Sequence, residues 1–182
     1  AWVPIFDLED WWRQCTANAK YMRYAEMIES CAGGSPTPQT KAFDACRKRS
    51  ASSWLTPPVP FMLDINGGLF DGRDGSVPFT HSLKAFNSAA DAKDRIPEAD
   101  ISEFYETQKS PSSGGCTDEL YGGNQPVFRK ISGNVRVTIF NGGHGCVYGA
   151  ALNLLANQQK GFPAVWPEAK ETLVNDFHNA GL

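Results

Sequence analysis

Two segments of this chain each combine a short apolar strand, a glycine-rich loop and a helix, and this shared pattern restricts the fold most. Residues 60–90 read PFMLDINGGLF followed by DGRDGSVPFTHSLKAFNSAA, and residues 134–160 read NVRVTIF, NGGHGCV and then YGAALNLLANQQK. Apolar side chains at alternate positions from Val135 to Ile139 indicate a strand. Pro78 suits the first turn of a helix. The pattern therefore predicts an α/β fold with two strand–loop–helix units.

Ionisable residues occupy both glycine-rich loops. Asp71 and Asp74 follow the first strand, and His144 follows the second. In open α/β sheets, ligands bind at the carboxyl ends of the strands, where these loops begin. A carboxylate and an imidazole placed there have the roles of acid and base in a nucleophilic triad. The alternative interpretation is an aspartate that only shapes a turn and a loop histidine with no chemical role.

At these residues the chain resembles the α/β-hydrolase superfamily, and more narrowly its prolyl-oligopeptidase-like and bacterial esterase-like branch. The segment DGRDGSVPFTHSLKAF is similar to the acid loop of that branch, and VTIFNGGHG is similar to its histidine loop. The order, acid before histidine, is that of the superfamily. The resemblance implies the C-terminal portion of a hydrolase sheet, with about three mostly parallel strands flanked by helices. It also implies that His144 is catalytic and that no metal or organic cofactor is needed.

The resemblance leaves two candidates for the acid. The register D-x-x-V-P selects Asp74, whereas the looser register D-G-x-x-G-S-V-P selects Asp71. Cys146 stands where these relatives often carry an acidic residue, so any contact made by that residue is in doubt here. The two other histidines, His81 and His178, are expected on helix surfaces.

The resemblance also places a helical cap after a strand at residues 2–6, within a partial hydrolase domain that spans residues 1–182. Residues 7–58 are the expected cap, with helices at Leu8–Cys31 and 39–49. Trp11 and Trp12 lie at the start of this segment. They are candidate substrate-binding residues that suit a sugar ring or an aromatic ester if exposed, or else they belong to the core of the cap.

Residues 91–133 are polar and irregular apart from a predicted helix over Glu98–Lys109, and we expect them to form a lid or an oligomer contact. The tail, residues 163–182, is expected to be a short surface helix or partly disordered.

The nucleophile of a triad is missing from the sequence. No G-x-S-x-G or G-x-C-x-G occurs in it, and neither does an oxyanion motif of the HGGG type. Cys146 follows His144 by two residues on the same turn, which is a poor position for in-line attack. The resemblance implies that the nucleophile lies in a half preceding Ala1. We favour a separate chain that completes the fold; the alternatives are a longer protein of which this is a part, and a remnant that dimerises through its open sheet edge.

Composition limits the partners and the location. With 17 Lys and Arg against 20 Asp and Glu, the formal net charge of −3 gives no electrostatic reason for a nucleic-acid or anionic-membrane partner. No apolar run approaches the roughly 18 residues of a membrane span. The five cysteines show no C-x-x-C spacing, which argues against a zinc ribbon or a thioredoxin-type site. The relatives favour a secreted or periplasmic protein, with cytoplasmic as the alternative.

Together these features predict the acid- and base-bearing half of a serine hydrolase. Its substrates would be carboxylic esters, including acyl groups on sugars, or peptides. The alternative from another class is a non-catalytic scaffold or binding protein that kept the loops.

Overall fold

The computed structural model describes residues 1–111, 116–160 and 166. Its three-stranded sheet has the order β1 (Leu63–Gly68), β3 (Val135–Phe140), β2 (Pro126–Ser132). β1 and β3 run parallel, with Leu63 opposite Val135, whereas β2 is antiparallel to β3. The α/β class is therefore confirmed as a mixed sheet with helices. The expectation of mostly parallel strands is not confirmed, because one of the two strand pairs is parallel and the other is antiparallel.

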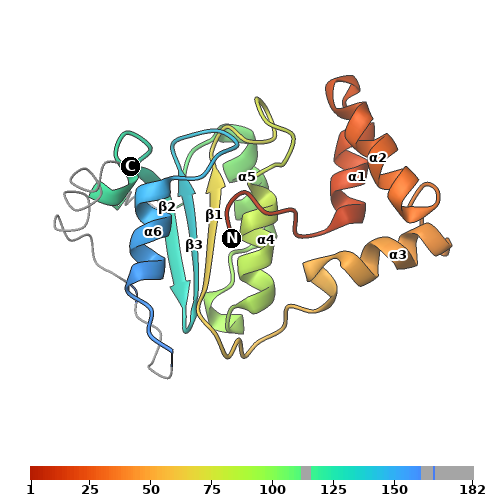
Figure 1. Cartoon of the computed structure of the whole chain (residues 1–182). Coiled ribbons are helices and arrows are strands. Elements are labelled where there is room, and N and C mark those ends of the chain that lie inside the picture. Colours follow the sequence, from red (N-terminus) through yellow and green to blue (C-terminus); the bar gives the residue numbers. More distant parts are fainter. Residues whose placement is uncertain (112–115, 161–165, 167–182) are drawn as a thin grey trace.

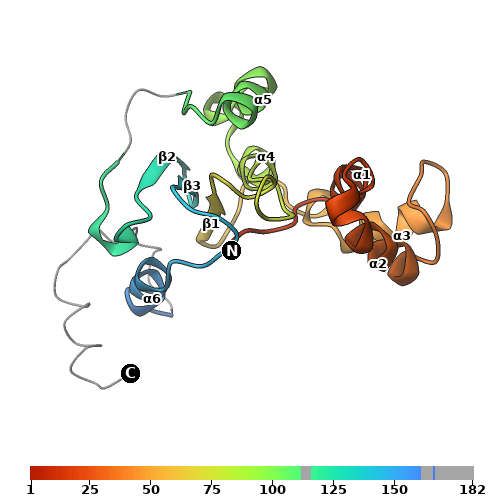
Figure 2. The same cartoon turned by 90° about the horizontal axis from the view of Figure 1, so that it is seen from above.

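Helices lie on both faces of the sheet and beside it (Figures 1 and 2). α4 (Thr80–Ala89) and α5 (Glu98–Thr107) cover one face, and α6 (Tyr148–Ala156) lies on the opposite side. Three further helices form a group to one side of the sheet: α1 (Leu8–Thr16), α2 (Met22–Ala32) and α3 (Lys41–Arg49). Short 3₁₀ turns occur at Ala19–Tyr21, Ala51–Ser53, Ala92–Asp94 and Glu119–Tyr121. Within the described residues, no helix has both the length and the apolar character required to cross a bilayer.

The face of the sheet toward α4 and α5 is apolar. Ile65, Val137 and Ile139 are fully buried there and belong to one core with Phe79 and Phe86. Because side chains of a strand alternate between its two faces, the intervening residues of β1 and β3 point the other way.

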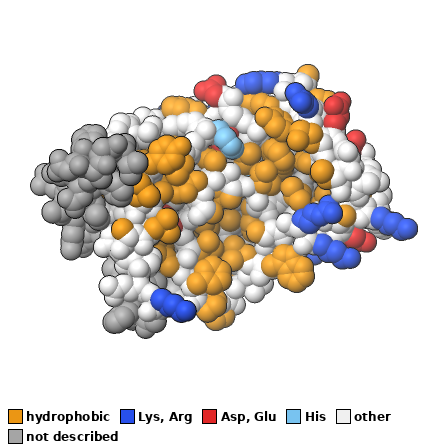
Figure 3. Space-filling view, in the orientation of Figure 1, with side chains coloured by type: hydrophobic (Ala, Val, Ile, Leu, Met, Phe, Trp, Pro, Cys, Tyr) orange, Lys and Arg blue, Asp and Glu red, His pale blue; other side chains and the backbone are white. Residues whose placement is uncertain are grey.

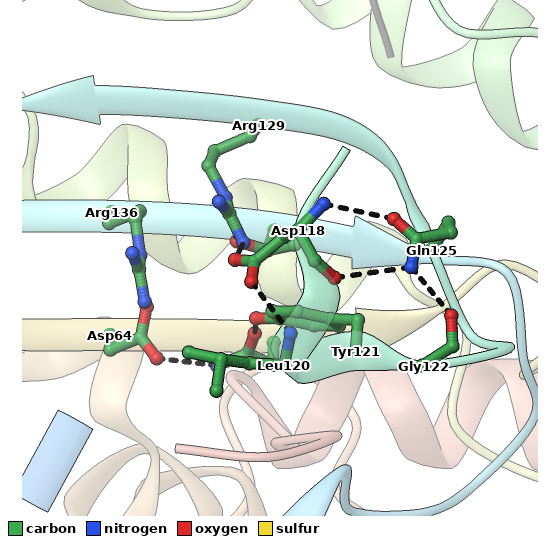
Figure 4. Close-up of polar contacts among 10 residues, drawn as sticks. Asp64, Asp118, Leu120, Tyr121, Gly122, Gln125, Arg129 and Arg136 are labelled. Atoms are coloured by element: carbon green, nitrogen blue, oxygen red, sulfur yellow. Dashed lines mark hydrogen bonds and ion pairs between the residues drawn. The ribbon is translucent and has the colours of Figure 1, made fainter. Parts of the chain in front are cut away.

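The opposite face of the sheet carries buried polar side chains, and Figure 4 shows the contacts among them. Arg136 Nε donates to Asp64 Oδ1 at 2.7 Å, and Tyr121 Oη donates to Asn66 Oδ1 at 2.6 Å. Asn66 Nδ2 in turn donates to Asp64 Oδ2 at 2.8 Å. Buried polar side chains destabilise a fold unless they have hydrogen-bond partners. Asp64, Asn66, Tyr121 and Arg136 all have such partners.

The helical group has a core of its own, formed by residues of α1 to α3 and of the first 3₁₀ turn together with Val77 from the loop after β1. The segment 7–58 is thus helical, as expected. The single helix expected over Leu8–Cys31 is divided, because the Asn18 side chain accepts a hydrogen bond from Lys20 N and starts a new turn there.

Residues 2–6 do not form the expected strand. Trp2 makes an isolated parallel bridge with Asn66, in which Val3 N donates to Asn66 O at 2.7 Å and Asn66 N donates to Ala1 O at 2.8 Å. Val3 has a φ of 43°, which turns the backbone out of the strand direction. Pro4 has no N–H to donate, so pairing with β1 ends at this point.

Residues 91–133 contain more regular structure than expected. The helix predicted at Glu98–Lys109 is α5, and the structure adds the edge strand β2, which we did not predict. The segment PVFRKIS begins with proline, and its pairing with β3 shifts between Pro126 and Phe128. This irregularity removes the clean alternation that identifies a strand in a sequence. The tail predicted at 163–182 lies outside the described residues apart from Trp166.

Candidate active site

The two glycine-rich loops meet at the carboxyl ends of β1 and β3. His144 Nδ1 lies 2.7 Å from Asp71 Oδ2. The Asp71 side chain is 1% exposed, whereas that of His144 is 49% exposed. A histidine ring reaches the molecular surface in Figure 3, close to orange apolar side chains. The pair thus combines a buried carboxylate with an imidazole that is open to solvent.

The Asp71 carboxylate is held by the backbone of its own loop. Its Oδ1 atom accepts hydrogen bonds from Gly72 N at 3.0 Å and from Val77 N at 3.2 Å. These bonds direct Oδ2 toward His144 Nδ1. A carboxylate on Nδ1 favours the tautomer with the proton on that atom, which leaves a lone pair on Nε2. Nε2 of His144 can therefore accept a proton from a group brought against it.

Of the two aspartate candidates, the structure brings Asp71 to the histidine. Asp74 is exposed three residues further along the loop, and its backbone carbonyl lies 3.3 Å from Lys20 Nζ. No described contact joins the Asp74 carboxylate to His144.

Two glycines permit the loops to approach. A Cβ atom on Gly75 would collide with Asp71 Oδ1 and lie 3.0 Å from the Cβ of His144. A Cβ atom on Gly68 would lie 2.6 Å from the carbonyl oxygen of Gly142 in the histidine loop. A larger residue at either position would separate the loops, so both glycines are part of the site even though they contribute no chemistry.

Neither tryptophan lines the pocket that lies at His144. Trp11 is 9% exposed and belongs to the core of the helical group, and its Nε1 atom donates to Ser76 O at 2.8 Å. Trp12 packs against the same core and donates to Glu29 Oε1 at 3.0 Å. Of the two interpretations of these residues, the structure favours membership of the core.

A shallow pocket of about 180 Å³ lies at His144. It is lined by Asn124, Phe140, Gly143, His144, Gly145, Cys146 and Val147. Asn124 and Phe140 were not predicted as site residues, because Asn124 stands in a polar loop with no motif around it and Phe140 is the last residue of a strand. Only the folding of the loop before β2 against the end of β3 shows that they are part of this pocket.

The Cys146 thiol lines the pocket but lacks the character of a nucleophile. Burial raises its pKa above the usual value, which favours the protonated thiol. A reactive cysteine requires the opposite shift, toward the thiolate. All five cysteines are free thiols in the structure.

His81, expected on a helix surface, is fully buried and lies outside the pocket at His144. His178 lies outside the described residues. Among the described residues there is no group of three or more His, Cys, Asp and Glu side chains arranged to hold a metal ion.

Comparisons with protein-family models, with curated proteins and with solved structures each found no match for this chain. The arrangement of its own residues is therefore the basis on which its function is proposed.

Proposed function

We propose that this chain supplies the acid and the base of a serine hydrolase, with Asp71 as the acid and His144 as the base. The observation that carries the proposal is the 2.7 Å contact between Asp71 Oδ2 and His144 Nδ1 in loops that follow two parallel strands. The nucleophilic serine would belong to a polypeptide outside residues 1–182, either a separate N-terminal half or a preceding part of the same protein.

In the proposed reaction, a serine hydroxyl attacks the carbonyl carbon of a carboxylic ester or a peptide while His144 Nε2 takes its proton. Asp71 stabilises the imidazolium that forms. When the tetrahedral intermediate collapses, the C–O or C–N bond breaks and the proton passes from Nε2 to the leaving group. Water then releases the acyl group from the serine by the same proton transfers. Acyl groups on sugars are one class of substrate, and secretion or export to the periplasm would suit it.

A second candidate is a scaffold or binding protein that retains the pair without catalysis. The observation in its favour concerns His144: within residues 1–111, 116–160 and 166, its only hydrogen bond is the one to Asp71. Nothing in that part of the chain supplies a nucleophile at Nε2.

Two conservative substitutions in one loop test the assignment. Affinity-tagged full-length chain, recovered from its native source with any associated polypeptide, is assayed with a short-chain p-nitrophenyl ester and labelled with a fluorophosphonate. We expect His144→Ala and Asp71→Asn to reduce kcat/KM by about 10⁴-fold. Asp74→Asn, which makes the same change three residues away on an exposed side chain, should leave the rate unchanged.

The fluorophosphonate should label a serine outside residues 1–182, either on the associated polypeptide or in a preceding part of the same protein. Activity that survives His144→Ala, or equal losses in Asp71→Asn and Asp74→Asn, would overturn the assignment. An assembly that neither hydrolyses the ester nor reacts with the fluorophosphonate would support the scaffold instead.

A further inference from the structure

The loop between β1 and α4 carries Asp71 and is called the acid loop here. It is also contacted by residues that lie away from His144. We propose that Trp11 is a positioning residue, which orients Asp71 through the Ser76–Val77 peptide. Its effect on the reaction rests on the proposed hydrolase function, whereas its effect on the Asp71–His144 pair does not.

One peptide group, between Ser76 and Val77, connects Trp11 to Asp71. Trp11 Nε1 donates to Ser76 O at 2.8 Å, and Val77 N donates to Asp71 Oδ1 at 3.2 Å. Ser76 C=O and Val77 N–H belong to the same planar unit, because the peptide bond has partial double-bond character. In a trans peptide these two groups point in opposite directions, so an indole that fixes the carbonyl also fixes the direction of the N–H.

Packing strengthens this connection. Trp11 and Val77 are 9% and 4% exposed and belong to the same core of the helical group. The loop is thus held at this peptide both by a hydrogen bond and by the buried side chain that follows it. A position held by both is more rigid than a loop tethered at its ends alone.

Two tyrosines hold neighbouring peptides of the loop. Tyr21 Oη donates to Arg73 O at 3.0 Å, and Tyr105 Oη donates to Gly72 O at 3.3 Å. Neither tyrosine lines the pocket at His144, and neither does Trp11. The helical group and α5 therefore contact the acid loop without contacting the space where a substrate would meet His144.

The helix that carries Trp11 offers a matched control in Trp12. Its Nε1 atom donates to Glu29 within the helical group, at 3.0 Å, and not to a carbonyl of the acid loop. Trp11→Phe and Trp12→Phe therefore each remove one indole N–H from α1. Only the first removes a donor from the Ser76 carbonyl.

The main experiment is NMR of the full-length chain labelled with ¹⁵N at histidine. In the wild type and in Trp12→Phe we expect a slowly exchanging Nδ1–H resonance from His144, since that proton lies in a 2.7 Å hydrogen bond to Asp71. In Trp11→Phe the resonance should broaden or disappear, because Asp71 Oδ1 loses the fixed Val77 N–H and the carboxylate turns more freely. An unchanged resonance in Trp11→Phe, or an equal loss in Trp12→Phe, would overturn the inference.

A wild-type measurement covers the case in which Trp11→Phe does not fold. The Trp11 indole proton and the Val77 amide proton should give the same opening free energy once each observed exchange rate is divided by the intrinsic rate of its group, because one opening of the loop exposes both. An opening free energy at the Val77 amide that is much smaller than that at the Trp11 indole would contradict the proposal.

In the assembled hydrolase, Trp11→Phe should lower kcat by about three- to tenfold, the value of one hydrogen bond, and leave KM unchanged. The role of Trp11 and the proposed hydrolase function can be disproved independently of each other. If no ester is hydrolysed, the NMR comparison still decides the role of Trp11; if Trp11 has no effect, the His144→Ala result still decides the hydrolase.

Discussion

His81 is buried on α4 with a hydrogen-bond partner for each ring nitrogen. Phe6 N donates to its Nδ1 atom at 3.3 Å, and Nε2 lies 3.2 Å from Gln14 Oε1. These partners suit a neutral ring that accepts at Nδ1 and donates at Nε2. Desolvation by burial lowers the pKa of His81 from 6.5 to about 4, with Lys84 acting in the same direction and Asp10 opposing it. The residue thereby joins the N-terminal segment, α1 and α4 in its neutral form.

This pairing makes stability depend on pH. An unfolded chain binds a proton at His81 below about pH 6.5, whereas the folded protein binds it only near pH 4. Between these values the unfolded state holds more protons, so the free energy of unfolding should fall as the pH drops from about 6.5 to about 4, by on the order of 3 kcal/mol. Urea unfolding of wild type and His81→Gln across this range measures the difference.

The control for this prediction is His144→Gln, which removes an exposed imidazole from the surface. Its stability should follow the wild-type curve through the same acid range more closely than that of His81→Gln does. If His81→Gln and the wild type lose stability in parallel, burial of His81 does not cause the pH dependence.

On the scale of elements, the polar face of the sheet joins β1 to β3. Asp64 and Arg136 are paired across the two strands, and their side chains are 3% and 6% exposed. The carboxylate also accepts from Asn66, and the guanidinium lies 4.7 Å from the centroid of the Trp166 ring. A buried ion pair adds little stability compared with a pair of apolar side chains of similar size. Removing only one partner, however, leaves the other charge buried without compensation.

Removing one charge of the Asp64–Arg136 pair should therefore lower the free energy of unfolding more than removing both charges does. Arg136→Met leaves a buried carboxylate without its cation, and we expect the free energy of unfolding to fall by about 3–5 kcal/mol. The double variant Asp64→Leu/Arg136→Met should recover most of that loss. Urea denaturation of the two variants gives the comparison, and a double variant as unstable as Arg136→Met would show that the charges are not coupled.

At the scale of the whole molecule, the chain has two main apolar cores that meet at the acid loop. One lies between the sheet and α4 and α5, and the other lies within the helical group. Val77 connects the loop after β1 to the second core. We therefore expect the helical group to open without exposing the core of the sheet, and such an opening would release the acid loop from Trp11.

Two isoleucines distinguish these cores. Ile28→Ala should destabilise the helical group by about 2–5 kcal/mol, and hydrogen exchange should accelerate in α1 to α3 while β1 and β3 stay protected. Ile65→Ala, the same deletion in the core of the sheet, should accelerate exchange in β1 and β3. Uniform acceleration throughout the chain in Ile28→Ala would mean that the molecule unfolds as a single unit.

Some of these features could be predicted from local sequence. β1, β3, α4 and α6 each have a repeating apolar pattern, and a glycine-rich loop separates strand from helix in both units. Because the two strands are parallel, the loops that follow them reach the same edge of the sheet. The order of these segments, together with the parallel direction that the resemblance implied, was therefore sufficient to predict that His144 meets the loop that carries Asp71 and Asp74.

Tertiary structure decided what depends on residues distant in the chain. Asp71 rather than Asp74 meets His144 because Gly72 N and Val77 N bind one carboxylate oxygen and Gly75 leaves room for the approach. β2 forms because its backbone pairs with the free edge of β3, although the register of this pairing is irregular. The sequence by itself determined that carboxylates stand in the loop after β1 and an imidazole in the loop after β3, because local propensity and the order of the segments along the chain are sufficient for this. Only the packed molecule decided which of them touch, because a contact between atoms depends on the approach of several segments at once.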